Sequence, residues 1–186
     1  MKKARISAVA GLVAATAVML SGCQTTNSSV PYEVSTDNVI AIQQGLQSKK
    51  ISVSNIELAQ GVNEHLLCRL DGDVKVAPGK TLSQYIKEAL QKELFTAQAY
   101  DPHGPAIAGS IEELSFSSVS PAYWQITMHV RSQTSPGYTV SVKYPFDTSW
   151  IAANACKNTA DAFAPAVQEL IKQVVTNPQF ATLAGK

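Results

Sequence analysis

The sequence predicts an α+β domain, in which a mostly antiparallel sheet of four to five strands carries two long amphipathic helices on one face. Two observations lead to this prediction. Several short segments alternate apolar with polar residues, as half-buried strands do. Two longer segments repeat apolar residues at helical spacing. Since a one-sided sheet and an amphipathic helix each need cover for an apolar face, we expect a single two-layered core.

The clearest strands are residues 124–131 and 138–146, where alternation is unbroken. A loop containing Pro136-Gly137 separates them, so we predict a hairpin with one apolar and one polar face. The preceding strand, residues 107–116, changes parity midway, and this predicts a bulge near Glu112-Glu113.

Two earlier strands are predicted at residues 51–58 and 66–70. Asp71-Gly72 is a tight-turn dipeptide, beyond which Val74 and Val76 would continue the pairing. The predicted sheet therefore contains strands from both halves of the chain.

The first long helix is predicted to begin at a capping box, Thr81-Leu-Ser-Gln84, and to end near Tyr100. The second covers residues 152–175. Its Pro165 either kinks a continuous helix or begins the final helix after a bend. A short helix is also predicted at residues 37–46.

The N-terminus has the features of a lipoprotein export signal. A basic segment, residues 1–5, precedes a mostly apolar segment, residues 6–20, and then Leu20-Ser21-Gly22-Cys23, which matches a lipobox. A membrane-spanning anchor is the alternative, but about 15 apolar residues fall short of the roughly 20 that a span needs. We therefore predict cleavage after residue 22 and lipidation of Cys23, which tethers the protein to a membrane.

The predicted organisation is a signal peptide (1–22), a polar, flexible tether (23–35), a single domain (36–180) and a C-terminal tail (181–186). Loss of the signal takes the formal charge from +1 to −2, because Lys2, Lys3 and Arg5 leave with it. A near-neutral chain lacks the basic surface of a nucleic-acid binder, so no nucleic-acid partner is expected.

Lipidation of Cys23 leaves two cysteines, Cys68 and Cys156, which we predict to form a disulfide in an oxidising compartment. Two free buried thiols are the alternative. A zinc site is less favoured, since isolated cysteines lack the paired spacing of zinc ligands.

The sequence contains no catalytic motif: no Gly-x-Ser-x-Gly, no His-Glu-x-x-His and no phosphate-binding loop. The three histidines, His65, His103 and His129, belong to different predicted elements. Asp71-Gly72-Asp73 lacks the further ligands of a calcium loop. Glu112 and Glu113 point to opposite faces of a regular strand, although the bulge could change that. We therefore predict a protein that is not an enzyme, with no metal and no cofactor.

The polar face of the predicted hairpin is the candidate partner-binding surface. Its candidate residues are Thr127, His129, Arg131 and Lys143. Four aromatic residues fall in phase on these strands and are interpreted as core: Trp124, Tyr138, Tyr144 and Phe146. A less favoured alternative is that Tyr123-Trp124 faces a ligand at the sheet edge. Trp150 is open to both interpretations.

The lipobox, the polar tether and the β-α-β-β-β-α order together resemble small periplasmic lipoproteins of the YajG and LptE type. The auxiliary lipoproteins of lipid-transport ABC systems are also similar. The resemblance covers residues 51–180 and rests on element order. It implies a non-catalytic subunit of an envelope assembly. By analogy with lipoprotein sorting, in which Asp after the lipidated Cys retains a protein in the inner membrane, Gln24 implies the outer membrane.

Three functions follow as hypotheses. The first is an accessory envelope lipoprotein that binds protein or lipid partners through its sheet edge or polar sheet face. The second is a hydrolase of cell-wall or lipid material, with a cleft that gathers Glu112 or Glu113 with His103. The third is a structural surface antigen. The first is preferred because the sequence predicts an anchor and a tether but contains no recognisable set of catalytic residues.

Overall fold

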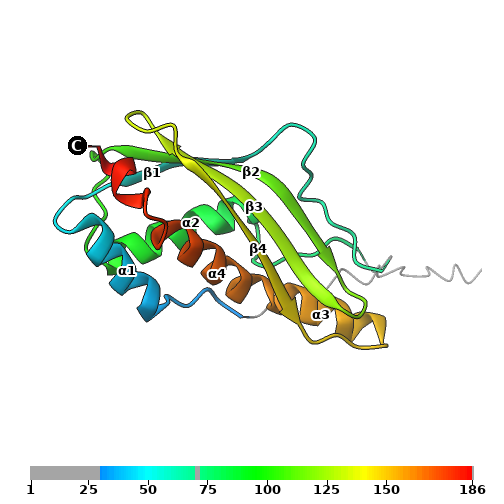
Figure 1. Cartoon of the computed structure of the whole chain (residues 1–186). Helices are drawn as coiled ribbons and strands as arrows, with labels where there is room; N and C mark the ends of the chain where they lie inside the picture. The colour runs from blue at the N-terminus through cyan, green and yellow to red at the C-terminus, as the bar shows by residue number, and fades with distance from the viewer. Residues whose placement is uncertain (1–29, 70–71, 186) are drawn as a thin grey trace, which may run out of the picture.

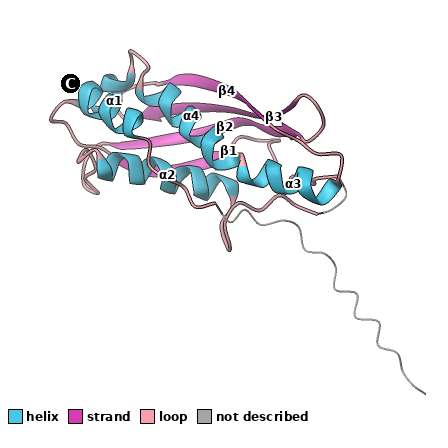
Figure 2. Ribbon diagram, turned by 90° about the horizontal axis from the view of Figure 1, so that it is seen from below, coloured by secondary structure: helices cyan, strands magenta, loops and turns pink. Residues whose placement is uncertain are grey.

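The computed structural model describes residues 30–69 and 72–185. Helices lie along one face of a four-stranded sheet and leave the other face open (Figures 1 and 2). This arrangement confirms the predicted α+β class. The elements in chain order are α1 (Thr36–Leu46), β1 (Ser52–Leu58), α2 (Leu82–Thr96), β2 (Ala106–Ser117), β3 (Ala122–Ser132), β4 (Tyr138–Phe146), α3 (Ala152–Asp161), α4 (Phe163–Val175) and the 3-10 helix η1 (Phe180–Ala184).

The strands lie in the order β1-β2-β3-β4. β1 runs parallel to β2, because α2 carries the chain back across the sheet between them. The β2–β3 and β3–β4 pairs are antiparallel, and a register shift between Ile111 and Glu113 confirms the predicted bulge. β4 is an outer strand, and its Pro145 lies opposite Tyr123 of β3.

The predicted capping box at the start of α2 is present, with Thr81 and Gln84 each accepting a hydrogen bond from the other's backbone N–H. The helix ends at Thr96 rather than near Tyr100. Gln98 takes a left-handed conformation (φ 59°), and the N–H of Ala99 donates to the carbonyl of Leu94 at 2.9 Å. This hydrogen-bonding pattern is a Schellman motif, which terminates a helix.

The second long helix is divided at Ala162 into α3 and α4. Pro165 falls in the first turn of α4, where a missing N–H costs no helical hydrogen bond. Of the two alternatives for Pro165, the structure therefore confirms the one in which it begins the final helix. Among the described residues, no helix meets the length and apolarity that crossing a membrane requires.

The predicted strand at residues 66–70 is wrong. Only an isolated bridge joins Leu67 and Asp73, with the N–H of Cys68 donating to the carbonyl of Gly72 at 3.0 Å. Arg69 takes a left-handed conformation (φ 46°), which ends the extended backbone before a strand can form. The rest of the predicted strand and turn, residues 70 and 71, lies outside the described part of the chain.

Both predicted domain boundaries also need correction. Tyr32, inside the predicted tether, is buried, and its hydroxyl donates to Glu93 at 2.6 Å. Leu183, inside the predicted tail, is fully buried in η1. The packed chain therefore extends at least from Tyr32 to Ala184, because apolar side chains at both ends find cover on the helices and the sheet. The rest of the tether, residues 23–29, lies outside the described residues, as do Cys23, Gln24 and the lipobox.

The core interpretation of the aromatic residues is confirmed for Trp124 and Tyr138, which are buried. The indole N–H of Trp124 donates to the carbonyl of Thr159 at 2.8 Å, and the hydroxyl of Tyr138 donates to the carbonyl of Val174 at 2.6 Å. Tyr144 and Phe146 are partly buried against the same core. Trp150 is different: it is fully exposed.

Candidate functional site

The four predicted partner-binding residues lie together on the open face of the sheet. Thr127, His129 and Arg131 alternate along β3, and Lys143 lies on the neighbouring β4 in register with Gln125. The buried residues of β3 alternate with them and face the helices. The sequence therefore predicted the composition of this face.

Most polar groups on this face already have partners within the sheet. The hydroxyl of Thr127 lies 2.9 Å from that of Ser141 and also donates to Glu113 at 3.2 Å. The Nε2 of His129 lies 2.9 Å from the carbonyl oxygen of Pro136, which can only accept, so Nε2 carries a proton. The ammonium of Lys143 lies 4.0 Å from the ring centre of Tyr123.

The hydrolase hypothesis requires His103 to meet Glu112 or Glu113. His103 lies before β2, where its backbone N–H donates to Asp101 at 2.9 Å. Glu113 is the eighth residue of β2, about 23 Å along the strand from its start at Ala106. The structure therefore does not bring these residues together. Within residues 30–69 and 72–185, no cluster of three acidic, histidine or cysteine side chains is arranged to hold a metal.

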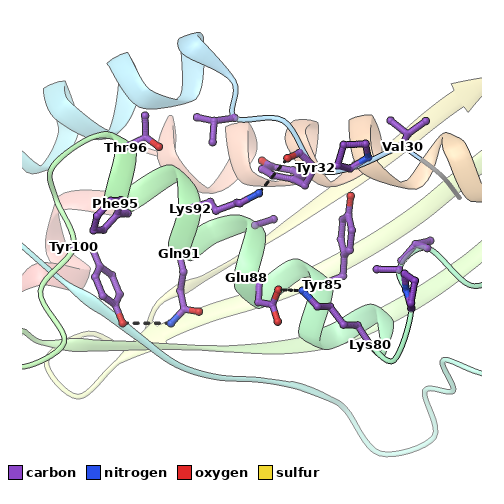
Figure 3. Close-up of a pocket in the computed structure, with 16 residues that line it drawn as sticks. Val30, Tyr32, Lys80, Tyr85, Glu88, Gln91, Lys92, Phe95, Thr96 and Tyr100 are labelled. Carbon is purple, nitrogen blue, oxygen red and sulfur yellow. Dashed lines mark hydrogen bonds and ion pairs between the residues drawn. The ribbon is translucent and has the colours of Figure 1, made fainter.

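A second candidate site is an apolar groove on the outer side of α2, with a volume of about 990 Å³ (Figure 3). We refer to it as the α2 groove. Its walls come from an N-terminal strap (Val30, Pro31, Tyr32, Val34), from the loop before α2 (Val76, Ala77, Pro78, Lys80) and from α2 and its continuation (Tyr85, Glu88, Ala89, Gln91, Lys92, Phe95, Thr96, Tyr100).

The strap is held in place by Glu93, a fully buried residue of α2. One carboxylate oxygen of Glu93 accepts hydrogen bonds from the hydroxyl of Tyr32 (2.6 Å), the N–H of Ser35 (3.0 Å) and the amide of Asn38 (3.3 Å). Burial, together with the Glu93 carboxylate, raises the pKa of Tyr32 far above its ordinary range. Tyr32 therefore stays a neutral donor, and the strap forms a fixed wall of the groove.

The polar side chains at the rim of the α2 groove are largely paired with one another, as the dashed contacts in Figure 3 show. Lys80 pairs with Glu88, and the amide of Gln91 donates to the hydroxyl of Tyr100 at 3.3 Å. The ammonium of Lys92 donates to the carbonyl of Tyr32 at 3.4 Å. Between these groups the surface is apolar, and it includes Phe95, whose side chain is 74% exposed.

Tyr85 lies on the floor of the groove. Its ring packs against Phe163, with centroids 5.5 Å apart, and burial raises the pKa of its hydroxyl to about 12. The phenol is therefore protonated at neutral pH and can donate a hydrogen bond.

Sequence reasoning missed the α2 groove because its walls come from separate parts of the chain. The buried stripe of α2 is readable at helical spacing, but the strap was predicted to be flexible. One available signal was Phe95, a large apolar residue that lies off the predicted stripe. A contiguous exposed apolar patch is typical of a contact surface, and Phe95 belongs to such a patch in the lining of the groove.

No family model and no curated protein matches the sequence. Among solved structures, the chain shares its fold with protein XCC0632 from Xanthomonas campestris, described as a member of the DUF330 family. The TM-score is 0.51 at 11% identity, and the alignment covers 81% of this chain and 94% of that one. A second solved chain, described as an uncharacterized protein, aligns with a TM-score of 0.40 at 9% identity, over 81% of this chain and 99% of that one.

The protein is therefore an α+β domain whose fold is shared with a bacterial protein. At 11% identity the likeness to XCC0632 establishes the fold alone. The likeness to YajG- and LptE-type lipoproteins stays a prediction.

Proposed function

We propose that this chain is a lipid-anchored, non-catalytic accessory lipoprotein of the bacterial envelope, and that the α2 groove receives an acyl chain of an envelope lipid. The observation that carries the proposal is the groove itself. Its volume of about 990 Å³ and its apolar lining lie within the range of small-molecule and lipid sites.

The hydrogen-bonding chemistry of the groove favours an acyl chain over an extended peptide. A peptide laid into the groove would bury backbone N–H and C=O groups, each of which needs a partner. The Gln91–Tyr100 and Lys80–Glu88 contacts already use rim groups, and the surface between them offers apolar contact. An acyl chain has no hydrogen-bonding groups, so it loses no hydrogen bonds to water when it enters the groove.

The charges at the rim favour a lipid with an anionic headgroup. Lys92 is an exposed cation whose visible partner is a backbone carbonyl, not a carboxylate. The protonated hydroxyl of Tyr85 adds a donor to the lining of the groove. A phosphate at the rim would accept a hydrogen bond from the ammonium of Lys92.

The envelope location rests on the sequence features of the N-terminus and on the disulfide. The lipobox at Leu20-Ser21-Gly22-Cys23 supports lipidation of Cys23, and Gln24 supports the outer membrane by analogy. The Cys68–Cys156 disulfide suits an oxidising compartment such as the periplasm. The separation of His103 from Glu113 along β2 supports a non-catalytic role.

The experiment uses the mature chain, purified with its disulfide intact, and a phosphatidylglycerol that carries a pyrene-labelled acyl chain. We expect saturable binding, and we expect Phe95→Asp to weaken it about tenfold, because a charge then lines the apolar wall. The matched control is Ile40→Asp, which changes another exposed apolar residue outside the groove. Unchanged binding by Phe95→Asp overturns the proposal.

A second pair of variants tests the headgroup. Lys92→Glu should lower the affinity for phosphatidylglycerol about tenfold while sparing a zwitterionic lipid, since only the anionic phosphate loses an attractive charge. Lys143→Glu, on the open sheet face, is the charge-matched control. If a photo-crosslinker at position 95 instead captures a protein segment in cells and no lipid co-purifies, the groove binds protein and the lipid assignment is wrong.

A further inference from the structure

Three loops come together at the end of the molecule where α3 lies, on the right of Figure 1, and they carry four exposed apolar residues. We refer to them as the apolar tip. They belong to three different loops: Leu67 (54% exposed) before α2, Val119 (61%) between β2 and β3, and Trp150 (102%) with Ile151 (64%) between β4 and α3. None of the four lines the α2 groove.

Arg69 joins these three loops. Its guanidinium donates to the carbonyl and hydroxyl of Ser118, beside Val119. It also donates to the carbonyls of Ser149 (2.9 Å) and Trp150 (3.4 Å). Because one planar group is bonded to two of the loops from the third, the backbones of the three loops hold fixed relative positions.

The disulfide reinforces the same end. Cys68 lies between Leu67 and Arg69 and is bonded to Cys156 in the first half of α3. Both cysteines are buried, so the covalent link lies beneath the exposed apolar residues. The tip is therefore an ordered apolar surface on a cross-linked base, not a set of loosely held loops.

The length of the predicted tether limits how far the domain can lie from the membrane. The strap is packed from Tyr32 onwards, so nine residue steps separate Cys23 from the packed chain, and they span at most about 32 Å when extended. A lipid on Cys23 therefore holds the domain within about one domain diameter of the bilayer. An exposed tryptophan flanked by aliphatic and small polar residues has the composition of membrane-interface anchors.

We infer that the apolar tip inserts into the interfacial region of the phospholipid bilayer that carries the anchor, and so fixes the orientation of the domain on the membrane. The inference rests on the proposed anchor at Cys23, but not on lipid binding in the α2 groove. In this orientation Trp150 and Ile151 lie among the headgroups, and the carbonyls near them are already occupied by Arg69.

The test exploits the presence of two tryptophans in the chain, one buried and one exposed. The mature chain from residue 23 is prepared without lipid and with the disulfide formed, so that Cys23 is the one free thiol, and is coupled to a maleimide phospholipid in vesicles of phosphatidylethanolamine and phosphatidylglycerol. Lipids with a shallow nitroxide should quench Trp150 about twofold and leave Trp124 bright. Trp150→Phe should abolish the quenched component.

Two further variants separate insertion of the tip from lipid binding in the α2 groove. Val119→Ser with Ile151→Ser should reduce the quenching of Trp150 without unfolding the domain, because both residues are exposed. Phe95→Asp, which disrupts the groove, should leave the quenching unchanged. If nitroxide lipids do not quench Trp150 and aqueous iodide does, the inference is overturned. This is the result expected if the tip binds a protein partner and not the bilayer. Because the anchor is supplied chemically, this result does not depend on lipidation of Cys23 in the cell.

Discussion

At the end of the molecule that carries the C-terminus, η1 covers the connection between β3 and β4. Phe180 and Leu183 of η1 are fully buried, and the hydroxyls of Ser135 and Thr182 lie 3.1 Å apart. At the opposite end, Arg69 and the disulfide join three loops, yet Trp150 and its apolar neighbours are exposed. Both ends are ordered by contacts between distant parts of the chain. The difference teaches that exposure at the apolar tip does not result from a lack of ordering contacts.

Removing the disulfide should cause the largest loss of stability. Cys68→Ser frees a cross-link between residues 88 apart, and the chain-entropy model predicts a loss of about 4 to 5 kcal/mol in the free energy of unfolding. Urea unfolding of the mature chain measures this loss. Reduction of the wild-type protein with dithiothreitol should bring its midpoint to that of the variant. A midpoint that does not move would mean that the link contributes nothing to stability.

The C-terminal end is tested by Phe180→Ala. Phe180 is fully buried against α1, and its ring lies so close to Gly45 that an added Cβ there would meet it at 2.9 Å. Truncation of this side chain should lower the free energy of unfolding by about 3 to 5 kcal/mol, because apolar burial is lost and a cavity remains. Thermal unfolding measures it, with the exposed Gln179→Ala as the control. A loss below that of the control would show that η1 is dispensable.

The ordering of the tip is tested by Arg69→Ala, which removes hydrogen bonds from the loops that bear Val119 and Trp150. We expect a loss of about 1 to 3 kcal/mol, because several carbonyls lose a charged donor. Hydrogen exchange should increase at residues 118–121 and 147–151 and stay unchanged in η1. Arg69→Lys keeps the charge but not the planar fork, so it should behave like the alanine variant. Equal protection in all three proteins would contradict the role assigned to Arg69.

The smallest effect is expected in the middle of the molecule, at Tyr85, and only at high pH. Its pKa is about 12 in the folded protein, above the ordinary 10.0, so the unfolded chain ionises first. The resulting stability is complete below pH 10 and is lost as the pH rises from 10 to 12. Tyr85→Phe should therefore flatten the decline of stability over this interval and show little change at pH 7. Parallel declines in the two proteins would exclude Tyr85 as a contributor.

Local patterns predicted most of the fold. The Thr81–Gln84 capping box and the alternation in β3 and β4 each depend on residues a few positions apart, and the structure confirms both. The Cys68–Cys156 disulfide was predictable because the lipobox removes the third cysteine from the count.

The groove and the tip could not be predicted because their contacts join distant residues. Tyr32 meets Glu93 across 61 positions, and Arg69 meets Ser149 across 80. The left-handed backbone at Arg69 also has no strong local signature, since it is not a glycine. What the sequence does offer is two aromatic residues outside any buried pattern, Phe95 and Trp150, and each marks one of the two sites.

Pro145 limits how this sheet can associate with another chain. It lies in β4, an outer strand, and a proline has no N–H with which to pair a newly added strand. Lys143, two residues earlier, adds a charge along the same edge. Both features are common devices against edge-to-edge aggregation. The proline and the lysine thus guard the β4 edge against strand addition, and the sheet is protected there from growing into a fibre.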